Sequence, residues 1–66
     1  MTLREARQAA HMTQATLARR LGLRQTAISS YEVGDSMPSV TRAREIEDIL
    51  GVLPGSIVFR RRETSA

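Results

Sequence analysis

The sequence predicts a small all-α domain, and three observations support this expectation. Its 66 residues suffice for one domain at most. Apolar side chains recur at helical spacing, and no segment shows the alternation with a period of two that is typical of a strand. Glycine and proline residues cut the chain into five short pieces, at Gly22, Gly34, Pro38, Gly51, Pro54 and Gly55. We therefore expect a bundle of five short helices.

The first two helices are expected over residues 2–10 and 14–21. The first carries a narrow apolar stripe made of Leu3, Ala6 and Ala10. Thr13 is placed to cap the start of the second helix, and Gly22 follows where a C-terminal cap belongs. The second helix is therefore only about two turns long.

Three further helices are expected over residues 25–32, 40–50 and 54–59. The third turns three apolar side chains inward, those of Ala27, Ile28 and Tyr31. Ser39 caps the fourth, in which apolar residues repeat at helical spacing until Gly51. Pro54 at a first helical position opens a brief fifth helix. Residues 1–59 then form the domain, and residues 60–66 form a basic tail.

Cysteine and histidine usage excludes several kinds of site. The chain has no cysteine, so it can form neither a disulfide nor a thiolate metal site. His11 is the only histidine and cannot build a metal site alone. The sequence also lacks a glycine-rich phosphate loop and a pair of carboxylates suited to a catalytic cleft. We therefore expect no metal, no cofactor and no enzymatic activity.

The chain shows no signal for membrane insertion or secretion. Its most apolar stretch, residues 49–59, is eleven residues long and interrupted by glycine and proline, so it is too short to cross a bilayer. The first residues are charged at Arg4, Glu5 and Arg7, unlike the start of a signal peptide. We expect a cytoplasmic location.

The charge is divided unevenly along the chain. Residues 1–31 carry a net charge of +4, residues 32–59 carry −3, and residues 60–66 carry +2. A pI near 11.1 with the basic charge on one side is typical of a polyanion binder. The charge alone does not separate nucleic acid from a membrane surface as the partner.

Residues 14–33 meet the physical demands of two short helices joined by a tight turn. Ala18 is small where the two helices approach each other, and Gly22 can take the left-handed conformation that the turn requires. Five apolar side chains form the wedge between the helices, those of Leu17, Leu21, Leu23, Ile28 and Tyr31. This combination, in a basic half of the chain, indicates a helix-turn-helix arrangement.

The run MTQATLARRLGLRQTAISSYEVGDSMPS resembles the Cro and lambda-repressor-like helix-turn-helix domains, also called the XRE family. The resemblance covers residues 2–59, with matches at Thr13, Gln14, Leu17, Ala18, Leu21, Gly22, Gln25, Ile28, Ser29, Glu32, Gly34 and Pro38. It implies a five-helix fold of the lambda-repressor-like type in a bacterial or phage protein. It also implies a sequence-specific transcription regulator that binds double-stranded DNA, as a homodimer on a near-palindromic operator.

The resemblance further implies which side chains meet DNA. The helix over residues 25–32 would lie in the major groove, and its base-reading residues would be Gln25, Thr26, Ser30, Arg24 and Ser29. Phosphate contacts would come from Gln14, Thr13, Arg7 and Arg19. Gln14 would also brace Gln25, and Arg7 would form a structural ion pair with Glu32.

Three positions depart from the family pattern. Arg24 stands where a capping serine or threonine is usual, so it is either a DNA contact kept despite the missing cap or a residue that the turn tolerates. Asp35 occupies a loop that is often basic, which argues against a phosphate contact there. His11 replaces a common glycine at a position that can require a left-handed backbone, and we interpret it as a local accommodation and not a pH sensor.

The C-terminal part leaves two questions open. This part contains more apolar residues than the core of one short helix needs, namely Leu53, Ile57, Val58 and Phe59. They either form the interface of a homodimer, which we favour, or close the monomer core. Arg60, Arg61 and Arg62 form either a solvated tail or a phosphate clamp.

The kind of regulator also stays open. A phage Cro-type repressor, a restriction-modification controller and an antitoxin all fit the sequence. An activating controller would additionally touch RNA polymerase, for which Glu45, Glu47 and Asp48 form a candidate surface, although a solvated helix face explains them more simply. The alternative function is a protein-interaction adaptor or the recognition module of a larger regulator. Such a protein would keep its partner after substitution of Gln14 and Gln25 together.

Overall fold

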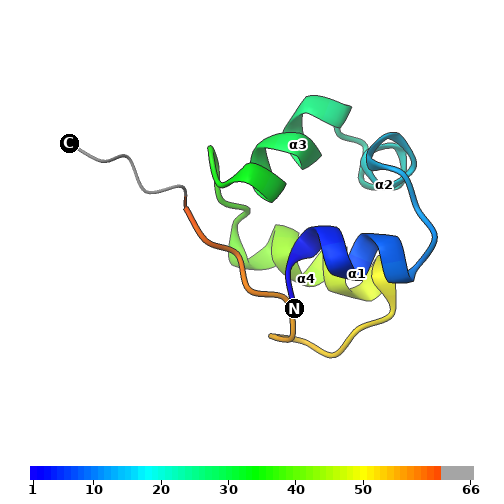
Figure 1. The fold of residues 1–66 in the computed structure, drawn as a ribbon, viewed down its shortest axis with the longest axis vertical. Coiled ribbons are helices and arrows are strands. Elements are labelled where there is room, and N and C mark those ends of the chain that lie inside the picture. The colour runs from blue at the N-terminus through cyan, green and yellow to red at the C-terminus, as the bar shows by residue number, and fades with distance from the viewer. Residues whose placement is uncertain (62–66) are drawn as a thin grey trace.

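A computed structural model describes residues 1–61, which form four α-helices and no strand (Figure 1). In chain order the helices are α1 (Leu3–Ala9), α2 (Gln14–Leu21), α3 (Gln25–Val33) and α4 (Val40–Leu50). The all-α prediction is therefore confirmed, and each of these four helices lies within a few residues of its expected bounds. Residues 62–66, which include Arg62 of the predicted basic tail, lie outside the described residues.

Side-chain caps start three of the four helices. Thr2 and Glu5 form a reciprocal capping box at the start of α1. The hydroxyl oxygens of Thr13 and Ser39 accept hydrogen bonds from backbone N–H groups in the first turns of α2 and α4, at 3.0 and 3.1 Å. These caps satisfy donors that would otherwise lack partners, so short segments of modest propensity begin helices at defined residues.

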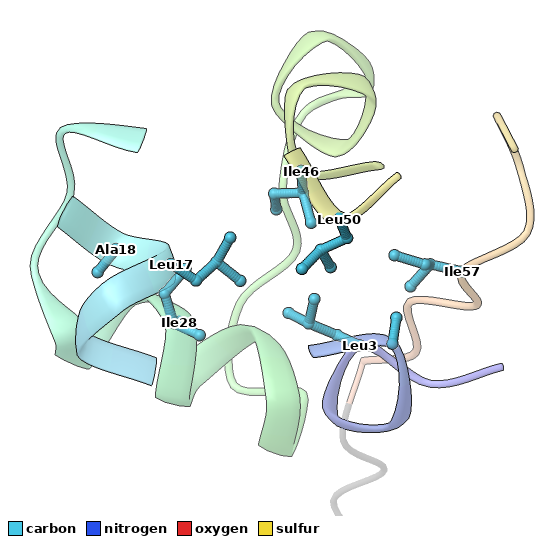
Figure 2. Packing of buried hydrophobic residues seen from close by; sticks show 8 residues of the cluster. Leu3, Leu17, Ala18, Ile28, Ile46, Leu50 and Ile57 are labelled. Atoms are coloured by element: carbon cyan, nitrogen blue, oxygen red, sulfur yellow. The ribbon is translucent and has the colours of Figure 1, made fainter. Parts of the chain in front are cut away.

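The core lies where all four helices and the C-terminal segment meet (Figure 2). Its buried members are Leu3, Ala6, Leu17, Ala18, Ile28, Ile46, Leu50 and Ile57. Leu17, Ile28 and Ile46 are the largest fully buried side chains and come from α2, α3 and α4. Burial of each such side chain contributes roughly 1.5–3 kcal/mol to folding. The core thus fixes α2 and α3 against α1 and α4, which lie on the opposite side of the domain in Figure 1.

The connection between α2 and α3 is a tight turn. Gly22 ends α2 in the left-handed conformation, with φ of +71°, and the Leu23 N–H donates to the carbonyl of Ala18 at 2.8 Å. Arg42 on α4 donates to the carbonyl of Leu21 at 3.3 Å, so it satisfies an acceptor at the open end of α2. The predicted role of Gly22 and the predicted helix-turn-helix arrangement are both present.

The predicted fifth helix over residues 54–59 is wrong. Gly55 has φ of +82°, and its N–H donates to the carboxylate of Glu47 at 2.8 Å instead of entering a helix. The Val58 N–H then donates to the carbonyl of Met1 at 2.8 Å, not to a carbonyl four residues earlier. Pro54 is a valid helix-start signal, but these contacts with distant residues hold the segment in a non-helical path beside the N-terminus.

Candidate nucleic-acid interface

The residues predicted to read bases lie on α3 and at its N-terminal end. Arg24, Gln25 and Thr26 are exposed, whereas Ser29 and Ser30 on the next turn are half-buried. Arg24 is the N-cap residue, and its side chain makes no capping hydrogen bond. The structure therefore places three exposed side chains at the N-terminal end of α3 and the two short hydroxyl side chains one turn further along the helix.

A buried carboxylate anchors the elements behind this surface. The side chain of Glu32 on α3 is inaccessible to solvent, and its Oε2 lies 2.6 Å from Nε of Arg7 on α1. Arg7 Nη2 also donates to Glu32 Oε1 at 3.3 Å, and Arg7 Nη1 donates to the carbonyl of Met12 at 2.9 Å. The expected contact between Arg7 and Glu32 is thus present, and it ties α1 to the far end of α3.

Arg4 is a further partner of Glu32 that the sequence analysis did not identify. Its Nε lies 3.3 Å from Glu32 Oε1, and its side chain is 59% exposed. Arg4 precedes Arg7 by three residues on α1, so both side chains reach the same side of that helix. The helical spacing of two arginines was the available signal, but it did not identify the carboxylate that they share.

Glu32 also fixes the orientation of a glutamine at the start of α2. Gln14 Nε2 donates to Glu32 Oε1 at 3.1 Å, and a carboxylate oxygen can only accept. The amide oxygen of Gln14 therefore points the other way, where it accepts a hydrogen bond from Gln25 Nε2 at 3.3 Å. This contact is the predicted brace. It leaves the amide oxygen of Gln25 and one of its N–H groups available at the exposed end of α3.

The partners of Glu32 keep it ionised. Burial raises the pKa of this carboxyl, but hydrogen bonds from Arg7, Gln14 and Arg4 together outweigh the burial, so the pKa falls below its ordinary value. The carboxylate therefore stays charged at neutral pH and holds its three donors in place.

The residues predicted to contact phosphate divide into two groups. Arg19 is exposed on α2, and Gln14 and Thr13 lie at the start of that helix. Arg7 differs because its side chain is only 12% exposed and three of its N–H groups have protein acceptors. The contact of Arg7 with Glu32 is therefore present, and its predicted contact with a phosphate stays a prediction.

The N-termini of α2 and α3 are suited to an anion. Neither helix has an acidic residue in its first turn, so the partial positive charge of their free N–H groups is not neutralised locally. Exposed arginines at positions 19, 20 and 24 add formal positive charge on the same two helices. This arrangement favours a phosphate backbone over a neutral partner.

Backbone geometry explains one of the unusual positions, His11. His11 has φ of +58°, the only positive φ among described residues other than glycine, so the glycine-like conformation expected there is present. Asp35 is exposed in the connection between α3 and α4, and its N–H donates to the carbonyl of Ser30 at 2.9 Å.

The four apolar residues predicted at a dimer interface do not share one environment. Leu53 is 79% exposed and Val58 is 49% exposed. Phe59 is half-buried and packs against the core. Ile57 is only 5% exposed and belongs to the core, as expected if this residue closes the monomer, and its predicted place at a dimer interface stays a prediction.

The acidic residues of α4 also differ in their exposure to solvent. Glu47 is 5% exposed and bonds to Gly55, whereas Glu45 and Asp48 are exposed. The three carboxylates therefore do not form the continuous acidic face considered for RNA polymerase. Arg60 and Arg61, the described part of the basic tail, are exposed.

Residues 1–61 lack two kinds of feature, a membrane-spanning helix and a metal-binding cluster. Within residues 1–61, no helix has the length and apolar character needed to span a bilayer. The same residues contain no group of three or more histidine, cysteine or acidic side chains that could hold a metal ion.

The fold and this surface define a helix-turn-helix domain, with α2 and α3 as the two helices of the motif. The family model described as "Helix-turn-helix" matches residues 3–56, most of the chain. The chain belongs to this family of Cro and lambda-repressor-like (XRE) domains, which are DNA-binding transcription regulators. No curated protein and no solved structure shows a significant match to the chain.

Proposed function

We propose that the protein binds a near-palindromic operator as a homodimer, with α3 of each copy in the major groove. The observation that carries this proposal is the chain of hydrogen bonds from buried Glu32 through Gln14 to Gln25. Such a chain holds a base-reading amide in one orientation before DNA arrives, so less conformational entropy is lost on binding. A glutamine that is only exposed to solvent would not require these hydrogen bonds.

Gln25 is the main reader of sequence in this proposal. With one N–H donated to Gln14, its remaining N–H and its amide oxygen match the N7 acceptor and N6 donor of adenine. Thr26 and Arg24 flank it and reach neighbouring bases, where threonine suits a thymine methyl and arginine suits guanine. Ser29 and Ser30 are shorter and half-buried, so they contact only bases that lie close to α3.

Phosphate contacts supply much of the affinity. The start of α2 offers the side chains of Thr13 and Gln14 together with its free N–H groups, and Arg19 adds an exposed cation on the same helix. Each phosphate neutralised contributes about −0.9 to the slope of log affinity against log salt concentration. Replacement of Arg19 by alanine should therefore make this slope shallower by about that amount.

We assign the protein to the class of small regulators that act by occupying DNA, as a Cro-type repressor, a restriction-modification controller or an antitoxin does. A regulator that acts by occupying DNA requires only the base-reading and phosphate-binding residues described above. A controller that activates must also contact RNA polymerase, and Glu45 and Asp48 are the acidic residues of α4 exposed for such a contact.

Selection from a random duplex library at about 150 mM salt tests this function, because purely nonspecific binding is weak at that ionic strength. The expected result is enrichment of an inverted repeat with half-sites about 10 base pairs apart. A variant with both Gln14→Ala and Gln25→Ala, checked for folding by circular dichroism, serves as the matched control and should lose the enrichment. If wild-type protein enriches nothing at any concentration, the adaptor function replaces this proposal.

A further inference from the structure

The outer side of α4 has an exposed ridge between two hollows. Val40 and Arg44, one helical turn apart, line both hollows. The first hollow lies between α4 and the C-terminal segment and is lined from α4 by Val40, Ala43, Arg44 and Glu47. The second continues along Thr41, Glu45 and Asp48. A ridge of residues spaced by four with a groove on each side is the shape that another helix packs against.

Apolar side chains at both ends of this helix lack cover. Val40 at the start of α4 is 81% exposed, and Leu53 just beyond its end is 79% exposed. Val58 on the adjoining segment is 49% exposed. A small domain gains stability by burying such side chains against a partner.

Two charged groups beside the ridge also lack ionic partners among the described residues. Glu47 is 5% exposed, and its carboxylate receives only the N–H of Gly55. Arg44 lines the same hollow, yet its guanidinium makes no ion pair or hydrogen bond within residues 1–61. Buried carboxylates are usually paired with a cation, but within residues 1–61 no cation of this copy pairs with Glu47.

We propose that α4 of a second copy covers this surface, antiparallel to the first and related to it by a two-fold axis near Ala43. Arg44 of each copy then pairs with the partner's Glu47, and Val40 of each copy enters the hollow beside the partner's Ala43. This inference rests on the homodimer of the proposed function and names the surface that forms it.

The charges and the shape together select a second copy as the occupant. A two-fold interface must present the same patch twice, so it needs a donor and an acceptor on each side. The patch carries both, because Arg44 and Glu47 lie three residues apart on one face of α4. It also carries both a ridge and a groove. Ala43 is small at the centre, which lets two helix backbones approach closely, and the base-reading end of α3 stays free.

Sedimentation analysis of the full chain without DNA tests the proposal with two surface variants. Val40→Asp places a charge in the hollow, and Arg44→Glu brings two carboxylates together across the axis. Each should raise the dimer dissociation constant at least tenfold and leave the thermal melt of the monomer unchanged. Arg20→Glu, a charge reversal at an exposed position on α2, is the matched control and should dimerise like wild type.

Cross-linking gives an independent readout because the chain has no cysteine of its own. Ala43→Cys should form a disulfide-linked dimer under mild oxidation, whereas Ala9→Cys, exposed on α1, should not. If both charged variants dimerise like wild type and Ala43→Cys does not cross-link, this surface is overturned while the homodimer itself stands. If wild type is monomeric both free and on its selected operator, the homodimer and this surface are both overturned.

Discussion

Replacement of Glu32 by alanine is the most direct perturbation of the network behind the interface. The wild-type carboxylate is fully buried and accepts hydrogen bonds from Arg7, Arg4 and Gln14. Alanine would remove the acceptor from all three at once. Arg7, with a side chain only 12% exposed, would then retain its charge in a site that admits little water.

The size of the effect follows from the burial of each partner. Removal of one member of a buried ion pair costs about 3–5 kcal/mol, because the other charge is left uncompensated. Arg4 is 59% exposed, so its pairing adds less than about 1 kcal/mol. Since Arg7 keeps some access to solvent, we expect a loss of about 3 kcal/mol in the free energy of unfolding. For a domain of this size, such a loss lowers Tm by roughly 12–24 °C.

Thermal melts followed by circular dichroism at pH 7 measure this loss. Glu45→Ala is the matched control, because Glu45 is exposed and its ion pair with Arg42 spans 3.6 Å. The control should lower Tm by no more than a few degrees. If Glu32→Ala melts within about 2 °C of wild type, the network does not support the fold and the reasoning is refuted.

The same network predicts a pH dependence with a defined sign. Burial opposes ionisation of Glu32, but the hydrogen bonds from Arg7, Gln14 and Arg4 hold its folded-state pKa below the ordinary value of 4.5. Its stabilisation is therefore fully present above pH 4.5 and is lost as the pH falls below that value. Glu32→Gln should show a smaller fall in Tm between pH 5 and pH 3 than wild type shows. An identical fall would mean that other carboxylates control acid unfolding.

Three further substitutions have separable outcomes. Gln25→Ala should weaken operator binding by roughly 5- to 150-fold in fluorescence anisotropy, since a bidentate base contact is worth about 1–3 kcal/mol, and an unchanged Tm would exclude a folding defect. Arg24→Ser should restore a helix cap and raise the free energy of unfolding in urea by about 1 kcal/mol. The same variant should bind DNA more weakly. If it binds DNA as tightly as wild type, Arg24 is not a DNA contact and is only tolerated by the turn. His11→Gly should stabilise the domain by up to about 1 kcal/mol, because φ of +58° is unstrained for glycine, and a loss of stability would contradict that account.

Local signals predicted most of the helices. Thr13 and Ser39 cap α2 and α4, and Gly22 and Gly51 end them in the left-handed conformation, as their positions in the sequence indicate. Such caps act within one helical turn, so they can be read from neighbouring residues. Pro54 is a signal of the same kind, yet residues 54–59 do not form a helix, because Glu47 and Met1 supply competing hydrogen bonds.

The candidate site likewise contains some contacts that the sequence predicted and others that only the structure reveals. The sequence identifies Gln14, Gln25 and the pairing of Arg7 with Glu32 through a family resemblance. It does not identify Arg4 as a second cation on Glu32, nor the burial of Arg7, whose side chain is only 12% exposed. These properties depend on how α1 packs against α3, and sequence spacing does not determine that packing.

The sequence by itself determined the helical class, the turn at Gly22 and the family, because each depends on residues close together in the chain or on a linear motif. Only the tertiary structure decided the course of the segment after α4. It placed Ile57 in the core, turned Glu47 inward and left Val40 and Leu53 exposed. The physical reason is that burial and hydrogen-bond partners are set by segments up to 57 residues apart, as in the contact between Met1 and Val58. Local propensity carries no information about such contacts.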